Sequence, residues 1–135
     1  SDAAELKRLV EQHNLSGRVE LRMGYRDRDE IASLVNGALA CAYLPVDEDS
    51  LGYVTMEAFA AGKAVLTVDD SGGLLEIVKD GETGRVAPPR VRALSKALSD
   101  LASNPARTAA MGRAAREMLD AKKLTWDFTL SQLLA

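Results

Sequence analysis

Two carboxylates, Asp49 and Glu57, stand eight residues apart on either side of Gly52. The residues after this glycine predict a helix, whose first amides lack intrahelical partners and carry about half a positive charge. Because Gly52 has no Cβ, an anion can approach that helix end closely, and a diphosphate would be stabilised there without a lysine. Glu57 falls in a helix that is apolar nearly all round, where a charge needs partners. Two ribose hydroxyls would supply them, at about 1.5–3 kcal/mol per hydrogen bond.

Each of these residues also has a purely structural interpretation. Asp49 is a residue type that favours turns and helix starts, and Glu57 can be a solvated carboxylate stabilised by the helix dipole. The segment Asp70-Ser-Gly-Gly73 is either a tight turn or a turn that presents amides to a ligand. Glu76, which follows it, can be a charge near a helix cap. The spacing of Asp49 and Glu57 favours a sugar-nucleotide site over these alternatives.

A second chemistry remains open for the acidic residues after an apolar strand. Asp47, Glu48 and Asp49 form a DxD pattern like that of Mg²⁺-dependent phosphatases, in which one aspartate attacks phosphate. Pro45 crowds the end of that strand, and no acidic pair with a suitable lysine follows a later strand. Clustered loop carboxylates are more often solvated than metal-bound, so we expect no metal and no cofactor.

The pattern of apolar residues predicts an α/β fold with a Rossmann-like parallel sheet covered by helices. Strands are predicted at 19–23, 38–44, 64–68 and 85–87, and helices at 6–13, 27–35, 52–61 and 74–78. From Val91 onward only helices are expected, three in number, the first with Val91, Leu94, Leu98 and Leu101 on one stripe. Asn104 before Pro105 predicts the start of the second, and Trp126 lies in the third.

Composition limits the class of protein. The 135 residues predict one domain, 1–135, and the net charge of −3 with 4% aromatic residues argues against a nucleic-acid partner. No transmembrane segment or export signal is visible. The single Cys41 lies in an apolar run and is expected to be a small buried thiol. We therefore expect a cytoplasmic setting.

The motif residues resemble the C-terminal, donor-binding half of the retaining family 4 glycosyltransferases of GT-B fold. That family carries a pattern of the form PSxxEGFGxxxxEAxAxGxPV, then GGxxEhhxDGxxGhhh, where h is apolar. The residues largely in register are Pro45, Ser50, Leu51, Gly52, Glu57, Ala58, Gly62, Val65, Gly72, Gly73, Glu76, Asp80, Gly81 and Gly84. The match spans residues 19–86, and the closing helices are also similar.

The resemblance implies roles for particular residues. Glu57 would hold the ribose, and Asp49 would lie near the donor sugar and the leaving diphosphate as the catalytic acidic residue. Asp49 is one methylene shorter than the family's glutamate, and Glu48 beside it is a possible substitute. The remaining implied donor-binding residues are Ser50, Leu51, Gly52, Tyr53, Gly72 and Gly73, with Gly24, Tyr25 and Arg26 near the base.

The implied activity is transfer of a sugar from a UDP- or GDP-linked donor to an acceptor hydroxyl, with retention of configuration. The acceptor-binding N-terminal domain and its basic diphosphate-binding residues have no counterpart here, so we expect the chain to be truncated on its N-terminal side and inactive alone. The enzyme would be cytoplasmic, or it would be peripheral to the inner membrane if the absent domain binds that membrane. The alternative is a non-catalytic nucleotide-sugar-binding or assembly module.

Overall fold

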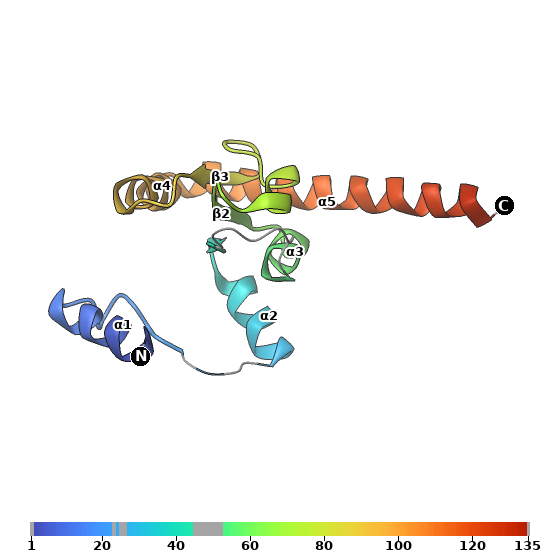
Figure 1. Ribbon diagram of the computed structural model, residues 1–135. Coiled ribbons are helices and arrows are strands. Elements are labelled where there is room, and N and C mark those ends of the chain that lie inside the picture. Colours follow the sequence, from blue (N-terminus) through green and yellow to red (C-terminus); the bar gives the residue numbers. More distant parts are fainter. Residues whose placement is uncertain (1, 23, 25–26, 45–52, 135) are drawn as a thin grey trace. The chain divides into compact units, whose positions relative to one another are not determined.

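A computed structural model describes residues 2–22, 24, 27–44 and 53–134 (Figure 1). The chain forms two compact units, Ser1–Glu30 and Ile31–Ala135. The two units are considered separately below, and the expectation of a single domain remains a prediction.

The first unit is built on helix α1 (Asp2–Gln12). Asn14, with a φ of 56°, ends the helical region, and the amides of Arg18 and Val19 then both bond to the Leu15 carbonyl at 2.8 Å. The strand predicted at 19–23 does not form over residues 19–22, and Met23 lies outside the described residues. A strand needs a neighbouring strand for its backbone groups, and the described part of this unit offers only helical residues and turns.

The second unit contains a parallel sheet of three strands in the order β1-β2-β3. The strands are β1 (Ala40–Ala42), β2 (Ala64–Val68) and β3 (Gly84–Ala87). Cys41 is opposite Val65, and Leu66 is opposite Arg85. All five residues of β2 are buried, as expected for a central strand covered on both faces. The prediction at 64–68 is confirmed, and β1 is shorter than the predicted 38–44.

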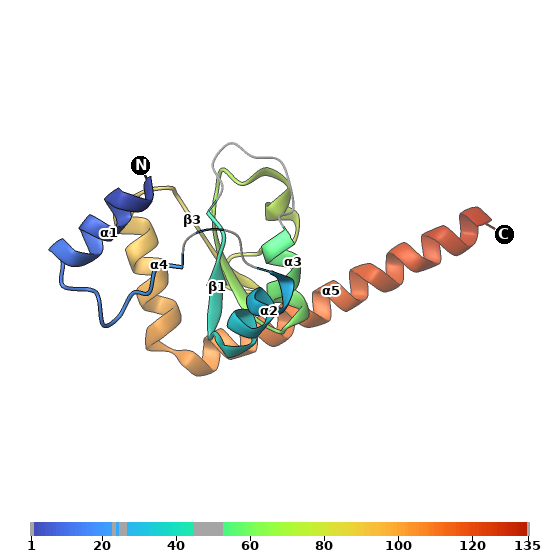
Figure 2. The ribbon, with the colours of Figure 1, turned by 90° about the horizontal axis from the view of Figure 1, so that it is seen from below.

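Helices cover the two faces of this sheet (Figure 2). On one face, α2 (Arg28–Gly37) and α3 (Tyr53–Ala60) pack a core that includes Val35, Phe59 and Val65. On the other face, α4 (Val91–Ser103) packs Ala97 and Leu101 against Leu66. The alternation of β2 side chains between the two cores follows from the period of a strand. The α/β class with a parallel sheet is therefore confirmed.

The first turn of α2 is capped as the sequence predicts. The Glu30 amide donates to Asp27 Oδ1 at 2.8 Å, which satisfies one of the helix's free N–H groups. The short helix expected at 74–78 is a 3₁₀ helix, η1 (Gly72–Glu76), and Ile77 and Val78 after it are buried in the first core.

The closing segment holds two helices rather than the predicted three. After α4, helix α5 runs without a break from Pro105 to Leu134. Asn104 caps it, since Asn104 Oδ1 accepts from the Arg107 amide at 3.1 Å. The residues between the two predicted helices, 119–125, include neither glycine nor proline, so nothing ends the helix there.

The apolar stripe expected on α4 is only partly buried. Leu101 is 5% exposed, but Val91 is 84% and Leu98 53% exposed. Alanines take the inner positions instead, because Ala97 and Ala93 allow the helix to approach the sheet closely.

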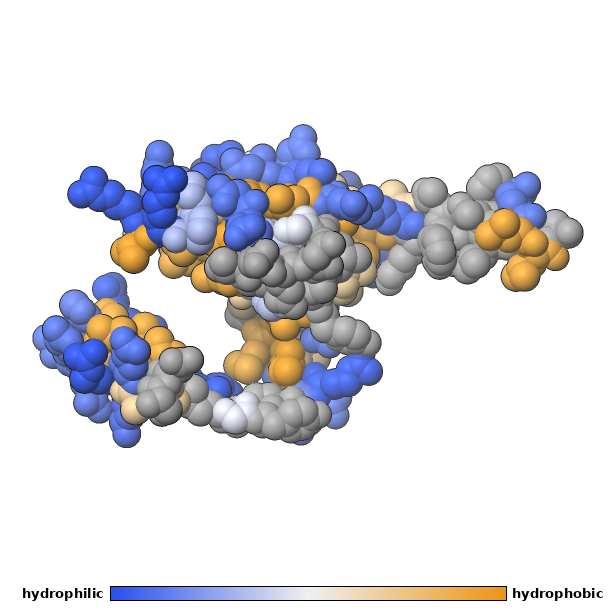
Figure 3. Space-filling model, in the orientation of Figure 1, coloured by the Kyte–Doolittle hydropathy of each residue, from blue (hydrophilic) through white to orange (hydrophobic). Residues whose placement is uncertain are grey.

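Apolar side chains are exposed at the end of α5 (Figure 3). Leu133 and Leu134 are 77% and 85% exposed. Among the described residues, no helix is both long and apolar enough to cross a bilayer.

Candidate functional site

The carboxyl ends of β1 and β2 define the edge of the sheet at which the candidate residues gather. In a parallel sheet the chain leaves each strand at this edge, so the helix after β1 begins there, as does the turn after β2. Tyr53 opens α3, and Gly72 and Gly73 open η1. Three of the predicted donor-binding residues therefore belong to the same edge.

Other predicted residues lie outside the described part of the chain. These are Glu48, Asp49, Ser50, Leu51 and Gly52 near the start of α3, and Tyr25 and Arg26 of the expected base site. Their assignments remain predictions. Gly24 is described and has a φ of 88°, a conformation that suits glycine, but it belongs to the first unit and is not placed against the sheet.

Glu57 lies in the second turn of α3 and is half-buried. It lines a pocket of about 310 Å³ with Asn36 of α2 and the apolar residues Ala32, Val35, Ala60 and Ala61. Within the described residues its carboxylate has no hydrogen-bond or ion-pair partner. A carboxylate in a mostly apolar pocket is stabilised by hydroxyl or amide donors, and none of the described residues supplies one to Glu57.

Three buried hydroxyls near this edge were not anticipated from the sequence. Thr55, Thr67 and Ser71 are each 0% exposed, and none of their side-chain oxygens has a hydrogen-bond partner in the part of the chain that is described. The sequence did contain a sign of two of them. Thr55 in α3 and Thr67 in β2 are hydroxyl residues that interrupt apolar runs, at positions where the pattern predicts apolar side chains.

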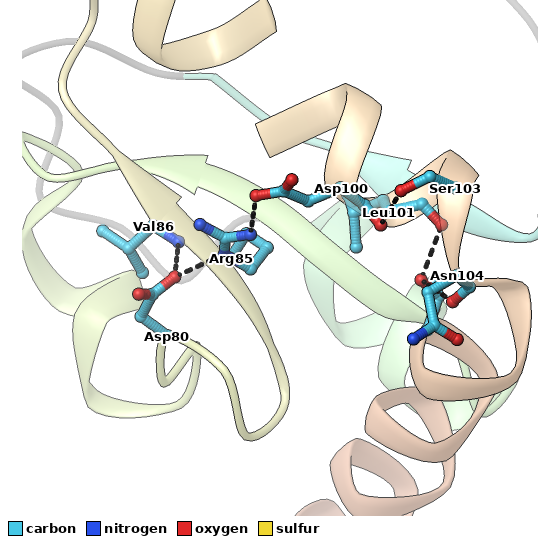
Figure 4. A network of polar contacts seen from close by, with 8 residues as sticks. Asp80, Arg85, Val86, Asp100, Leu101, Ser103 and Asn104 are labelled. Carbon is cyan, nitrogen blue, oxygen red and sulfur yellow. Dashed lines mark hydrogen bonds and ion pairs between the residues drawn. The ribbon is translucent and has the colours of Figure 1, made fainter. Parts of the chain in front are cut away.

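The acidic glycine turn after η1 has a structural role. The Asp80 carboxylate accepts from the Val86 amide and from Arg85 Nε, both at 2.9 Å, and Arg85 Nη1 donates to Asp100 of α4 at 2.8 Å (Figure 4). Gly81 takes a φ of 80°, and its amide bonds to the Gly84 carbonyl at 2.8 Å. These motif residues fix β3 to α4.

Arg85 also stabilises the charged form of Asp100. It holds the pKa of the Asp100 carboxyl below its usual range, mainly through the hydrogen bond between them. The two carboxylates in turn raise the pKa of Arg85. The Arg85–Asp100 pair therefore stays charged at neutral pH.

Cys41 is half-buried in β1 rather than fully buried. Burial raises the pKa of its thiol, and the positive charge of Lys63 opposes this effect more weakly. A thiol that stays protonated is a poor nucleophile, which agrees with the structural role expected of it.

No group of three or more metal-ligating side chains comes together among the described residues. The Asp47–Asp49 cluster lies outside them, so the expectation of a metal-free site stays a prediction.

Comparison with known proteins identifies the family. The family pattern described as "Glycosyl transferases group 1" matches residues 1–118. The chain belongs to this family. It is 37% identical over 107 residues to a glycogen synthase of Mycobacterium tuberculosis, covering 78% of this chain and 24% of the relative. It is 32% identical over 129 residues to the mouse alpha-1,3/1,6-mannosyltransferase ALG2, covering 96% of this chain and 30% of the relative.

Solved structures agree with the group 1 fold. Anabaena HepE, solved in complex with UDP-glucose, matches with a TM-score of 0.79 over 97% of this chain and 36% of its own, at 22% identity. The likeness shows the fold, which is that of GT-B glycosyltransferases. The chain spans about a quarter to a third of the length of the curated relatives it matches.

Proposed function

We propose that this group 1 chain is the donor-binding half of a retaining family 4 glycosyltransferase. The complete enzyme would move a sugar from a nucleoside diphosphate to an acceptor hydroxyl. The chain would bind the nucleotide sugar at the carboxyl edge of its sheet, and the acceptor would be bound by the remainder of the protein.

The observation that carries this proposal is the Glu57 carboxylate. It is half-buried, it lines a pocket, and it lacks a partner among the described residues, although it stands on a helix whose other side packs into the core. A ribose offers two adjacent hydroxyls, and both can donate to one carboxylate. The helix end before it, at Tyr53, favours the negative charge of the diphosphate.

The domain's part in the reaction would be electrostatic. When the sugar leaves, negative charge grows on the diphosphate, and a preorganised helix end lowers the energy of that state. Asp49 would lie near the donor sugar, with Glu48 as its substitute. Retention of configuration requires the acceptor hydroxyl to attack from the face that the diphosphate leaves, so both substrates must meet on one side of the sugar.

The nucleotide would be UDP or GDP. The complex of Anabaena HepE with UDP-glucose favours uracil, but only through a shared fold.

Calorimetric titration of the chain with UDP, GDP and ADP tests the proposal. We expect one of them to bind, without added metal, and Glu57→Ala to weaken that binding by about 2 kcal/mol or more. Glu117→Ala, which removes an exposed carboxylate from α5, is the charge-matched control and should leave binding unchanged. Failure of all three nucleotides to bind would refute the donor-site assignment for this chain.

A further inference from the structure

The C-terminal end of α3 forms one wall of the Glu57 pocket. Ala60, the last residue of the helix, and Ala61 after it both line this pocket together with Glu57. The Ala61 amide donates to the Glu57 carbonyl at 3.0 Å, so the backbone of Glu57 is tied to this wall. A displacement of the helix end would therefore reach both the wall and the residue that carries the carboxylate.

A glycine turn closes this helix end but leaves one carbonyl without a donor. Gly62 takes a φ of 73°, and its amide donates to the Phe59 carbonyl at 3.0 Å. The Lys63 amide donates to the Ala58 carbonyl at 2.8 Å. These two bonds form a Schellman motif, in which a glycine in the left-handed region ends a helix. The turn supplies no donor to the carbonyl of Ala60, which is one of the last carbonyls of α3 and needs a partner from elsewhere.

A side chain from α5 supplies that donor. Arg116 Nη1 donates to the Ala60 carbonyl at 2.6 Å. The guanidinium is oriented by Asp120, one turn further along α5, whose Oδ2 accepts from Arg116 Nε at 3.3 Å. A hydrogen bond from a charged donor is stronger than one from a neutral donor, and a cation is favourable at the C-terminal end of a helix. Arg116 therefore completes the end of α3 from a distant part of the chain.

The backbone that carries Arg116 is itself firmly packed. Ala115 and Leu119 of α5 are 0% and 4% exposed and belong to the core that α3 covers. Gly112, about one turn before Arg116, lies so close to the Gly62 carbonyl oxygen that a Cβ would collide with it. The guanidinium is thus presented from fixed backbone, although the side chain itself is exposed.

We propose that Arg116 is a positioning residue for the ligand of the Glu57 pocket. It does not line the pocket but holds the carbonyl of Ala60, and through this helix end it would set the place of the Glu57 carboxylate. The inference rests on the proposed function, in which two ribose hydroxyls donate to that carboxylate. Such a paired contact depends on orientation, so a small shift of α3 would weaken it and leave the contacts of the rest of the nucleotide unchanged.

The test removes the charged donor and follows the preference for ribose. The nucleoside diphosphate that binds the unmodified chain is titrated into Arg116→Gln beside its 2′,3′-dideoxy form. Arg113→Gln is the matched control, because it removes the same charge from an exposed residue about one turn away. We expect Arg116→Gln to lose about threefold or more of the preference for the ribose form and Arg113→Gln to lose none. Loss of positive charge alone would weaken both forms alike and would not change this ratio.

A conservative variant and a measurement without nucleotide complete the test. Arg116→Lys should keep most of the preference, because lysine still offers a charged donor. Hydrogen exchange at the Ala61 amide, which bonds to Glu57, should become about threefold or more faster in Arg116→Gln and stay the same in Arg113→Gln.

Two results would overturn the proposal. Unchanged exchange in Arg116→Gln would show that Arg116 does not hold the helix end. An unchanged ribose preference in Arg116→Gln would show that holding the helix end does not position the ligand. Failure of the unmodified chain to bind any nucleotide would refute the proposed function instead, and the exchange measurement would still decide whether Arg116 holds this wall of the pocket.

Discussion

Arg85 is held by carboxylates from two different parts of the fold. Asp80 lies in the turn before β3 and Asp100 in the third turn of α4, and Arg85 bonds to both at less than 3 Å. Arg85 is only 21% exposed, so its charge is better shielded from solvent than that of an ordinary surface arginine. Asp80, which belongs to the family motif, therefore has a structural role in this chain: it holds Arg85, which in turn bonds to α4.

The Asp100–Arg85 ion pair predicts a specific pH dependence of stability. Because Arg85 lowers the pKa of Asp100 in the folded state, the pair contributes stability above the ordinary aspartate pKa of about 3.9 and loses it as pH falls through the lower folded value. In urea titrations, Asp100→Asn should be less stable than the unmodified chain at pH 6, and the gap should close in acid. A gap of constant size down to pH values near 2.5 would contradict this account.

At the level of single residues, the sequence predicted positions better than contacts. Glu57 was singled out because a charge on an apolar helix needs a partner, and its unpaired carboxylate agrees with that argument. The unpaired buried hydroxyls of Thr55, Thr67 and Ser71 were not foreseen, since a buried threonine is usually satisfied by a nearby carbonyl, as Thr108 is. Only the three-dimensional structure separates a paired hydroxyl from an unpaired one.

The elements of the fold are held together by close backbone approaches as much as by side chains. Gly112 in α5 packs against the turn between α3 and β2, and a Cβ at this position would collide with the Gly62 carbonyl oxygen. This contact lets α5 contribute to both cores, through Met111 on one side and Ala115 on the other.

Gly112→Ala should therefore destabilise the chain despite the better helix propensity of alanine. Alanine would add about 1 kcal/mol in an open helix, but forcing backbone apart typically costs about 1–3 kcal/mol, and here a carbonyl rather than a flexible side chain must move. Chemical denaturation measures the difference. Gly37→Ala, at the end of α2 with nothing near its Cβ, is the control and should be neutral or slightly stabilising. Equal behaviour of the two variants would contradict the packing argument.

Element prediction succeeded where local signals agreed with tertiary packing. The run at 64–68 forms a strand because its apolar residues are covered on both faces, and Asn104-Pro105 begins a helix because the cap and first-turn residues suit it. It failed at 19–22, where alternation alone does not supply a hydrogen-bonding neighbour. It also failed at 119–125, where the change in apolar pattern suggested two helices but no residue interrupts the backbone.

At the scale of the whole molecule, the chain covers only part of the length of its relatives, and this limits the activity that we expect of it alone. The group 1 family and the α/β fold follow from most of its length, yet it covers only 24–30% of the two curated relatives compared above. Under the proposed function, the described elements would bind the donor, whereas transfer would also require an acceptor site. We therefore expect nucleotide binding without turnover from the chain alone.

The most direct test of the account asks whether the Glu57 carboxylate binds the ribose. The nucleoside diphosphate that binds most tightly is compared with its 2′,3′-dideoxy form, each titrated into the unmodified chain and into Glu57→Ala. We predict that the unmodified chain binds the ribose form about tenfold or more tightly than the dideoxy form and that Glu57→Ala loses this preference. The effects on affinity of removing the hydroxyls and of removing the carboxylate would then not be additive. A preference that survives in Glu57→Ala would show that another group holds the ribose and would contradict the central claim.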